Sequence, residues 1–172
     1  SPGQGSCVFA VDDVRVGLLI CEDAWFDEPA AAARAAGAEL LAVINASPFH
    51  QGKGAEREAA MARRARACGL PLVYANLVGG QDEMVFDGRS LAVAADGRLV
   101  GRAPTFKENL FFVQASRAAA AIELKADVAA EQTPEAELWD ALVLGLRDYV
   151  EKNGFQRVAL GLSGGLDSAL VL

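Results

Sequence analysis

Residues 14–25 (VRVGLLICEDAW) combine an apolar run with a cysteine and two acids at its end, and they constrain the fold more than any other stretch. Five aliphatic side chains among residues 14–20 predict a buried strand of the kind found in parallel sheets covered by helices. Cys21 stands where this strand ends and a turn begins. In α/β enzymes that position presents a reactive group to substrate while a rigid sheet holds its backbone. Cys21 is therefore a candidate nucleophile.

The residues alone leave a second interpretation of Cys21 open, because free cysteines are often small buried apolar residues. The adjacent acids Glu22 and Asp23 would raise the pKa of the thiol, so an activating base or cation must come from elsewhere in the fold. His50 is the single histidine of the chain and lies in a loop. It is not a natural partner for Cys21.

The pattern after Cys21 alternates between alanine-rich and apolar stretches. A strand–helix–strand order implies parallel strands joined by a right-handed crossover. The predicted strands are residues 14–21, 39–46 and 71–77, and the predicted helices are residues 27–36 and 55–68.

The loop at residues 45–53 (NASPFHQGK) follows the second of these strands, at the same edge of the sheet as Cys21. Ligands of open α/β sheets bind along that edge. Lys53 is either a solvated lysine or a cation for a substrate carboxylate, and residue chemistry alone favours the solvated lysine. We expect the arginines of the following helix on a solvated or interface-facing side; they are Arg63, Arg64 and Arg66.

The second half of the chain contains weaker signals. They predict a polar loop at residues 78–83, alternating strands at 91–95 and 99–103, an irregular linker at 115–132, a helix at 133–153 and a strand at 157–162.

Residues 163–168 (SGGLDS) follow the last predicted strand and carry a second kind of chemistry. Two consecutive glycines let backbone N–H groups converge on an anion, and the serines add hydroxyl donors. Asp167, at the start of a helix, suits a magnesium ion that bridges phosphates. The pattern is not a Walker loop, because no Gly-Lys-Ser/Thr follows. The alternative is a tight strand-to-helix turn capped by serine.

Composition limits the function classes. Of the 172 residues, 52% are hydrophobic, enough for a packed core, and the net charge of -7 argues against a nucleic-acid surface. No apolar run approaches the roughly 20 residues of a membrane span, and no signal peptide is recognisable. Three cysteines without CxxC spacing argue against a disulfide framework and a structural zinc site. We expect a cytoplasmic protein.

The motifs together resemble a known family. Residues 18–25 are similar to the cysteine segment of the nitrilase superfamily, and residues 45–49, 76–83 and 86–90 to its glutaminase branch. Residues 163–168 resemble the SGGxDS pyrophosphate loop of ATP-dependent adenylating enzymes. In this order the motifs resemble the glutamine-dependent NAD synthetases over nearly the whole chain.

The resemblance implies an α/β fold in two parts. Residues 1–114 would be the carboxyl-terminal part of a nitrilase-like αββα sandwich. Residues 115–132 would be a linker, and residues 133–172 the start of a doubly wound adenine-nucleotide-binding domain. The family also implies a homo-oligomer.

For the first part, the resemblance implies a glutaminase. Cys21 would attack the side-chain amide of L-glutamine, giving a thioester and releasing ammonia. The backbone N–H of Glu22 would help to form the oxyanion hole. Ser47 and Lys53 match the family positions that hold glutamine, which favours a substrate-binding role for Lys53 over the solvated one.

For the second part, the resemblance implies an ATP-dependent ligase. ATP would adenylate the carboxylate of deamido-NAD, and the ammonia would displace AMP to give NAD. A tethered ammonia source raises its effective concentration. Asp167 would contact Mg2+, and the matching ATP-binding positions are Gly161, Leu162, Ser163, Gly164, Gly165, Leu166, Asp167 and Ser168.

The chain starts without an initiator methionine and stops one turn into the helix that follows the glycine-rich loop. We therefore expect it to be part of a longer protein and inactive by itself. The glutamate and lysine of the family triad would precede Ser1, and the deamido-NAD site would follow Leu172. Residues 107–109 (KEN) depart from the family's acidic tendency and are given no role.

Three alternatives remain. A stand-alone nitrilase-type amidohydrolase would hydrolyse glutamine without binding nucleotide. A truncated scaffold subunit would keep the fold without the triad. A different SGGxDS amidotransferase is disfavoured by the context of Cys21, since such enzymes pair the loop with another type of glutaminase.

Overall fold

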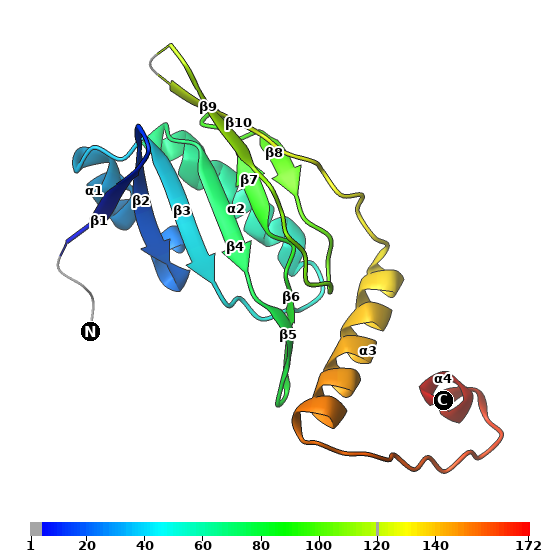
Figure 1. The fold of residues 1–172 in the computed structure, drawn as a ribbon. Coiled ribbons are helices and arrows are strands. Elements are labelled where there is room, and N and C mark those ends of the chain that lie inside the picture. The colour runs from blue at the N-terminus through cyan, green and yellow to red at the C-terminus, as the bar shows by residue number, and fades with distance from the viewer. Residues whose placement is uncertain (1–4, 120) are drawn as a thin grey trace.

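The computed structural model describes residues 5–119 and 121–172, and its centre is a six-stranded mixed sheet (Figure 1). Three neighbouring strands run parallel, as predicted, and the outer pairs are antiparallel. The strands lie side by side in the order β1 (Cys7–Val11), β2 (Val14–Ile20), β3 (Leu40–Asn45), β4 (Leu72–Asn76), β7 (Leu91–Val93) and β8 (Leu99–Arg102).

Helices α1 (Asp27–Ala35) and α2 (Lys53–Cys68) cover one face of this sheet (Figure 1). The close approach of α1 depends on Gly17 in β2, because a Cβ there would lie 3.0 Å from the Cβ atoms of Ala33 and Ala38. Apolar side chains of the central strands and both helices form the main core. Its buried members include Leu19, Ala30, Ala33, Leu41, Val43, Met61, Ala65, Leu72 and Tyr74.

The hairpin of β9 (Gln114–Ala118) and β10 (Ala121–Lys125) packs on the opposite face. The irregular linker predicted for residues 115–132 is therefore wrong for residues 115–118 and 121–125, which are strands, while the division into domains stays a prediction. Ile122 and Leu124 alternate with exposed residues and are buried against the sheet. Arg117 Nη1 lies 2.7 Å from Glu39 Oε1. Hydrogen bonds from Arg117 and from the backbone of Arg15 lower the pKa of Glu39 to about 2.

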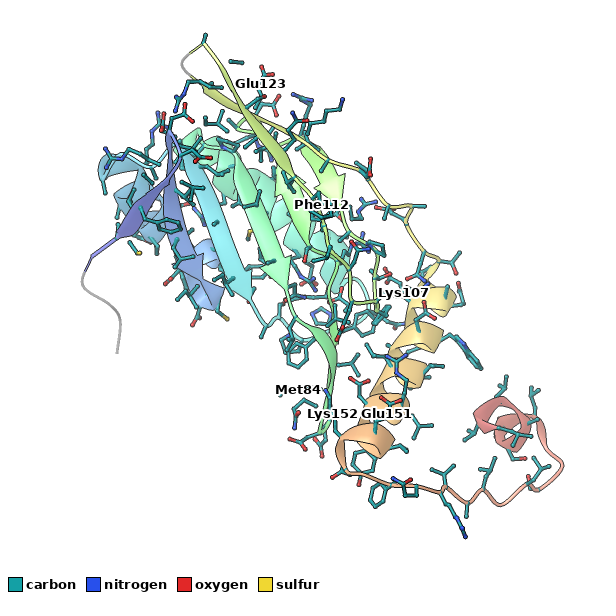
Figure 2. All side chains as sticks on the ribbon, in the orientation of Figure 1. Met84, Lys107, Phe112, Glu123, Glu151 and Lys152 are labelled. Carbon is teal, nitrogen blue, oxygen red and sulfur yellow. The ribbon has the colours of Figure 1, made fainter. Side chains whose placement is uncertain are left out.

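A second hairpin consists of β5 (Val78–Gln81) and β6 (Met84–Asp87), so the polar loop predicted for residues 78–83 is wrong for residues 78–81, and residues 82–83 form the turn of the hairpin. Helix α3 (Pro134–Lys152) packs on this hairpin through Ala141 and Leu144. Asp148 Oδ2 accepts from Gly80 N at 2.7 Å, and Lys152 Nζ, beside the hairpin in Figure 2, donates to Gly80 O at 2.6 Å. The hairpin and the helix thus hold each other in place.

The strand predicted for residues 157–162 is wrong, because this segment has no partner strand within the described part of the chain. It leads to the short helix α4 (Leu166–Val171), which lies beyond α3 and away from the six-stranded sheet (Figure 1). Among the residues described, no helix is both long and apolar enough to cross a membrane.

Candidate functional site

Cys21 lies at a sharp turn at the carboxyl end of β2, where the short 3-10 helix η1 (Cys21–Trp25) begins. Its φ of 51° falls in the left-handed region, which side-chain-bearing residues rarely adopt. Asp23 Oδ2 accepts a hydrogen bond from Ile20 N at 3.0 Å and closes the turn. The Cys21 thiol is exposed. A strained strand-to-helix turn of this kind lifts a nucleophile out of the edge of a sheet.

A pocket of about 580 Å³ opens at Cys21 and is called the Cys21 pocket below. It brings together four residues that the sequence singled out: Cys21, Glu22, Ser47 and Lys53. Their chemical roles stay predictions. The complete lining is Cys21, Glu22, Trp25, Asn45, Ala46, Ser47, Pro48, His50 and Lys53.

Lys53 lies in the first turn of α2 and is not a freely solvated lysine, because its side chain is only 20% exposed. Its Nζ is 4.8 Å from the centroid of the Trp25 ring and 3.5 Å from Glu56 Oε2. A cation over an aromatic face is held electrostatically. Trp25 is thus a pocket residue whose role the sequence did not reveal, although it stands four positions after Cys21 in the motif.

Ser47 is buried, and a chain of hydrogen bonds fixes its backbone. Ser47 N donates to Asn76 Oδ1 at 2.9 Å, and Asn76 Nδ2 donates to Asp87 Oδ1 at 3.3 Å. Asp87 in turn pairs with the fully buried Arg57 at 2.8 Å. A buried carboxylate needs such a partner, since an unpaired one is costly. The sequence did not identify this set of residues, because Arg57 and Asp87 come from distant segments.

Tyr74 lies on β4 beneath this network and is 2% exposed. Burial raises the pKa of Tyr74 to about 12, although the nearby Arg57 guanidinium and Ser47 hydroxyl favour its ionised form. The hydroxyl therefore stays protonated around neutral pH.

Arg64 corrects the prediction for the arginine cluster, since its side chain is buried whereas Arg63 and Arg66 are exposed. Arg64 Nε donates to Ala24 O at 3.1 Å, and its Nη1 pairs with Asp27. Burial lowers the pKa of Arg64. The residue fixes η1, and hence the turn that carries Cys21, against α2.

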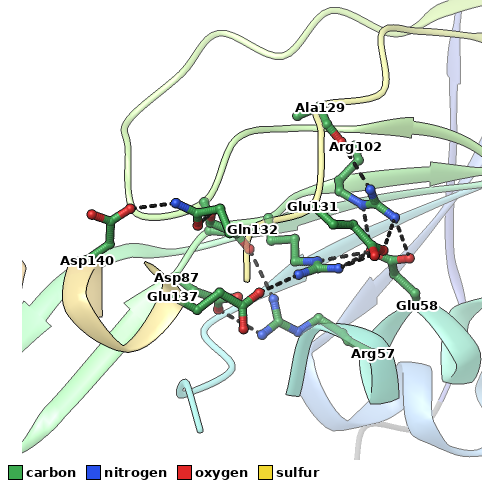
Figure 3. Close-up of polar contacts among 12 residues, drawn as sticks. Arg57, Glu58, Asp87, Arg102, Ala129, Glu131, Gln132, Glu137 and Asp140 are labelled. Atoms are coloured by element: carbon green, nitrogen blue, oxygen red, sulfur yellow. Dashed lines mark hydrogen bonds and ion pairs between the residues drawn. The ribbon is translucent and has the colours of Figure 1, made fainter. Parts of the chain in front are cut away.

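A second ionic cluster joins α2 to the segment before α3 (Figure 3). Glu58 Oε1 accepts from Arg89 Nε at 3.0 Å and from Arg102 Nε at 2.8 Å, and Arg89 Nη1 also donates to Glu137 Oε1 at 2.9 Å. Burial favours the neutral form of Glu58, yet the hydrogen bonds and charges of Arg102 and Arg89 hold its pKa below 4.5. Because Arg89 is two residues after Asp87, this cluster adjoins the network that holds Ser47.

The glycine-rich loop lies outside the Cys21 pocket and is exposed. Ser163 Oγ is 3.0 Å from Ser168 Oγ and accepts a hydrogen bond from Gly165 N at 3.3 Å. Gly164 has a φ of 84°, so the turn requires a residue that tolerates the left-handed region. Asp167 stands in the first turn of α4, beside these hydroxyl groups. Oxygen donors of this kind suit Mg2+, but no cluster of three or more metal-binding side chains forms within the described residues.

Two protein families match consecutive parts of the chain. Residues 1–122 match the carbon-nitrogen hydrolase family, and residues 138–172 match the NAD synthase family. A glutamine-dependent NAD(+) synthetase of Xylella fastidiosa is 48% identical over 99% of this chain and 32% of its own length. One of Rhodobacter capsulatus is 46% identical over 92% of this chain and 29% of its own length. The chain thus spans about a third of the length of these relatives.

Solved structures give the same result. The glutamine-dependent NAD+ synthetase of Acinetobacter baumannii, in complex with ADP, has a TM-score of 0.91 and 37% identity over 100% of this chain and 32% of its own. An amidase from Nesterenkonia sp. has a TM-score of 0.54 and 31% identity over 60% of this chain and 38% of its own. The nitrilase-like α/β fold expected from the sequence is therefore confirmed. The chain belongs to the carbon-nitrogen hydrolase family, and its residues 138–172 match the NAD synthase family.

Proposed function

We propose that this chain is part of an enzyme that makes NAD from deamido-NAD, ATP and glutamine. One observation carries the proposal: a cysteine pocket and an SGGxDS loop occur on the same chain, in separate places. The name and the 48% identity of the Xylella relative support it. The amidase structure matches with a TM-score of 0.54, against 0.91 for the NAD+ synthetase structure, so a stand-alone amidase accounts for less of the fold.

In the Cys21 pocket, the Cys21 sulfur bonds to the side-chain amide carbon of glutamine, the carbon–nitrogen bond breaks and ammonia leaves. The backbone N–H of Glu22 stabilises the oxyanion. Lys53 offers a cation for the substrate carboxylate, and Ser47 offers a hydroxyl beside it. Water then hydrolyses the thioester and releases glutamate. By family resemblance, the base for the Cys21 proton comes from the glutamate–lysine pair expected before Ser1.

At the glycine-rich loop, residues 161–168 bind ATP through backbone N–H groups and the hydroxyls of Ser163 and Ser168. Asp167 would hold Mg2+, which neutralises phosphate charge when bound. The carboxylate of deamido-NAD attacks the α-phosphorus and pyrophosphate leaves. Ammonia then attacks the acyl carbon and displaces AMP. This step needs adenylation because a free carboxylate is a poor electrophile.

Cytoplasmic location and a homo-oligomeric state belong to the same proposal and rest on family resemblance. The test is NAD formation by the protein that contains this chain, given deamido-NAD, Mg-ATP and glutamine. We expect NAD to form only when all three substrates are present, with one AMP released per NAD. Glutamine hydrolysis with no NAD from glutamine or ammonium would instead favour the stand-alone amidase.

A further inference from the structure

The side-chain amide of Asn45 is buried beside Cys21 with neither of its polar atoms hydrogen-bonded. Asn45 is 7% exposed, and within residues 5–119 and 121–172 its Oδ1 and Nδ2 have no partner. It ends β3, whose end lies beside that of β2 (Figure 1). Because Ile44 pairs with Ile20 in parallel register, Asn45 and Cys21 are neighbours at the edge of the sheet.

Asn45 lines two cavities that Cys21 also lines. One is the Cys21 pocket, and the other, of about 510 Å³, opens toward the exposed Ile20 and Ile44. Asn45 thus lies beside two spaces that Cys21 also reaches. Ligand sites in α/β sheets form at this edge.

The neighbouring Asn76 differs from Asn45, because its side-chain amide is hydrogen-bonded within the protein. Asn76 pairs with Asn45 in the register of β3 and β4, and its own side chain bonds both Ser47 and Asp87. The backbone of Asn45 is likewise satisfied, since its carbonyl accepts from Leu77 N at 3.0 Å. Of these two asparagines, Asn45 is the one whose side chain has no hydrogen-bond partner within the described residues; Tyr74 OH and Arg57 Nε are also without one.

An unpaired buried amide is unfavourable for folding, because it loses its hydrogen bonds to water and gains none in return. It becomes favourable when a ligand supplies the missing partners. The Asn45 amide offers one acceptor oxygen and two N–H donors. A carboxylate would pair with the donors only and would leave Oδ1 facing negative charge. A primary carboxamide supplies both a donor and an acceptor.

We propose that Asn45 is a substrate-binding residue that hydrogen-bonds the carboxamide of the amide substrate at Cys21. This inference rests on the proposed glutaminase function of the Cys21 pocket. The Oδ1 atom accepts from the amide NH2 of the substrate, and Nδ2 donates to its carbonyl oxygen. Asn45 thereby selects an amide over an isosteric ester or acid.

The test compares wild type with Asn45→Leu, which keeps the approximate size of the side chain and removes its polar groups, in the protein that contains this chain. Two substrates are used: glutamine and the γ-methyl ester of glutamate, which has a carbonyl but no N–H donor. We expect kcat/KM for glutamine to fall about 10- to 100-fold, because the partners of two hydrogen bonds are lost. The fall in kcat/KM for the ester should be clearly smaller. The melting temperature of the free protein should be unchanged or higher, since an unpaired polar group is removed.

The exposed Asn109 supplies the matched control. Asn109→Leu should leave kcat/KM for both substrates and the melting temperature unchanged. A lower melting temperature for Asn45→Leu, or equal losses for amide and ester, would overturn the inference, because either would make Asn45 a structural residue. If Asn45→Leu does not fold, the isosteric Asn45→Asp decides instead: it should lose glutamine hydrolysis about 10-fold or more around neutral pH, and unchanged hydrolysis would overturn the inference.

Cys21→Ala separates this inference from the proposed function. If Cys21→Ala still hydrolyses glutamine at the wild-type rate, the proposed function itself fails. If Cys21→Ala is inactive while Asn45→Leu hydrolyses glutamine normally, only the role of Asn45 is wrong.

Discussion

The side-chain oxygen of Asn76 accepts a hydrogen bond from the backbone N–H of Ser47 at 2.9 Å, and this contact ties the Cys21 pocket to a buried ion pair. The amide of Asn76 also donates to Asp87 Oδ1 at 3.3 Å, and Asp87 is paired with Arg57. Asn76 therefore links the buried Arg57–Asp87 ion pair to Ser47 in the wall of the pocket. The position of Ser47 depends on residues 29 and 40 positions further along the chain.

Replacing Asn76 by leucine should weaken both the fold and the binding of glutamine. The change leaves Ser47 N without its acceptor, so we expect the free energy of unfolding to fall by about 1–3 kcal/mol. The KM for glutamine should rise more than kcat falls, because a binding wall moves while the thiol stays in place. Urea unfolding and steady-state glutaminase kinetics measure the two effects. Asn109→Leu is the exposed control, and an Asn76→Leu enzyme with normal KM would contradict the positioning role.

Lys53 and Trp25 should act together on glutamine affinity. Lys53→Met removes the cation proposed for the substrate carboxylate, and a charged hydrogen bond of about 1.5–3 kcal/mol predicts a KM roughly 10- to 150-fold higher. Trp25→Leu removes the ring that holds the ammonium group and should raise KM several-fold, since a cation–π contact contributes about 0.5–2 kcal/mol. The exposed Lys125 gives the control Lys125→Met. Unchanged KM in Lys53→Met would exclude it from the substrate site.

The ionisation of Glu58 should make the stability of the fold depend on pH. Its pKa is held below the ordinary 4.5 despite burial, mainly by hydrogen bonds and charges from Arg102 and Arg89. A lowered pKa in the folded state means that the ionised group stabilises the fold above pH 4.5, and that this contribution is lost as the pH falls through the lower, folded-state pKa. Urea unfolding should therefore show Glu58→Gln less stable than wild type at pH 7, with the difference shrinking below pH 4.5. A difference that stays constant down to pH 3 would show that the charge of Glu58 contributes nothing.

The glycine-rich loop should be sensitive to backbone strain at Gly164. A Cβ there would meet no atom within 4 Å, so any effect of substitution comes from its φ of 84° alone. Asparagine tolerates the left-handed region better than alanine, and alanine better than valine. We expect the KM for ATP in ammonium-driven NAD synthesis to rise in the order Gly, Asn, Ala, Val. An order set by side-chain size, with Asn above Ala, would contradict a backbone effect.

Sequence patterns predicted the parallel strands, their helices and the meeting of Cys21, Ser47 and Lys53, because these depend on local apolar periodicity and on strand ends. The β5–β6 hairpin was missed because Gly79 and Gly80 favour a loop by composition. Its stability comes from α3, whose Asp148 contacts Gly80 from 68 positions away. Tertiary contacts overrode the local preference.

Buried charge was the other feature that local patterns could not predict. Arginines of α2 follow one another closely in sequence, yet Arg57 and Arg64 are buried whereas Arg63 is exposed. What decides burial is the acceptor supplied by a distant segment, Asp87 for Arg57 and the Ala24 carbonyl for Arg64. The side-chain contacts of Asn76 and the buried amide of Asn45 were not predicted for the same reason, because a single asparagine at a strand end gives no pattern.

The most direct test of the two-site function exchanges the nitrogen donor in the protein that contains this chain. NAD formation is followed with glutamine or with ammonium chloride, for wild type and for Cys21→Ala. We expect Cys21→Ala to lose synthesis from glutamine and to keep synthesis from ammonium at close to the wild-type rate, because the thiol serves only to release ammonia. Glutamine-driven synthesis that survives in Cys21→Ala would contradict the role of Cys21 as the glutaminase nucleophile.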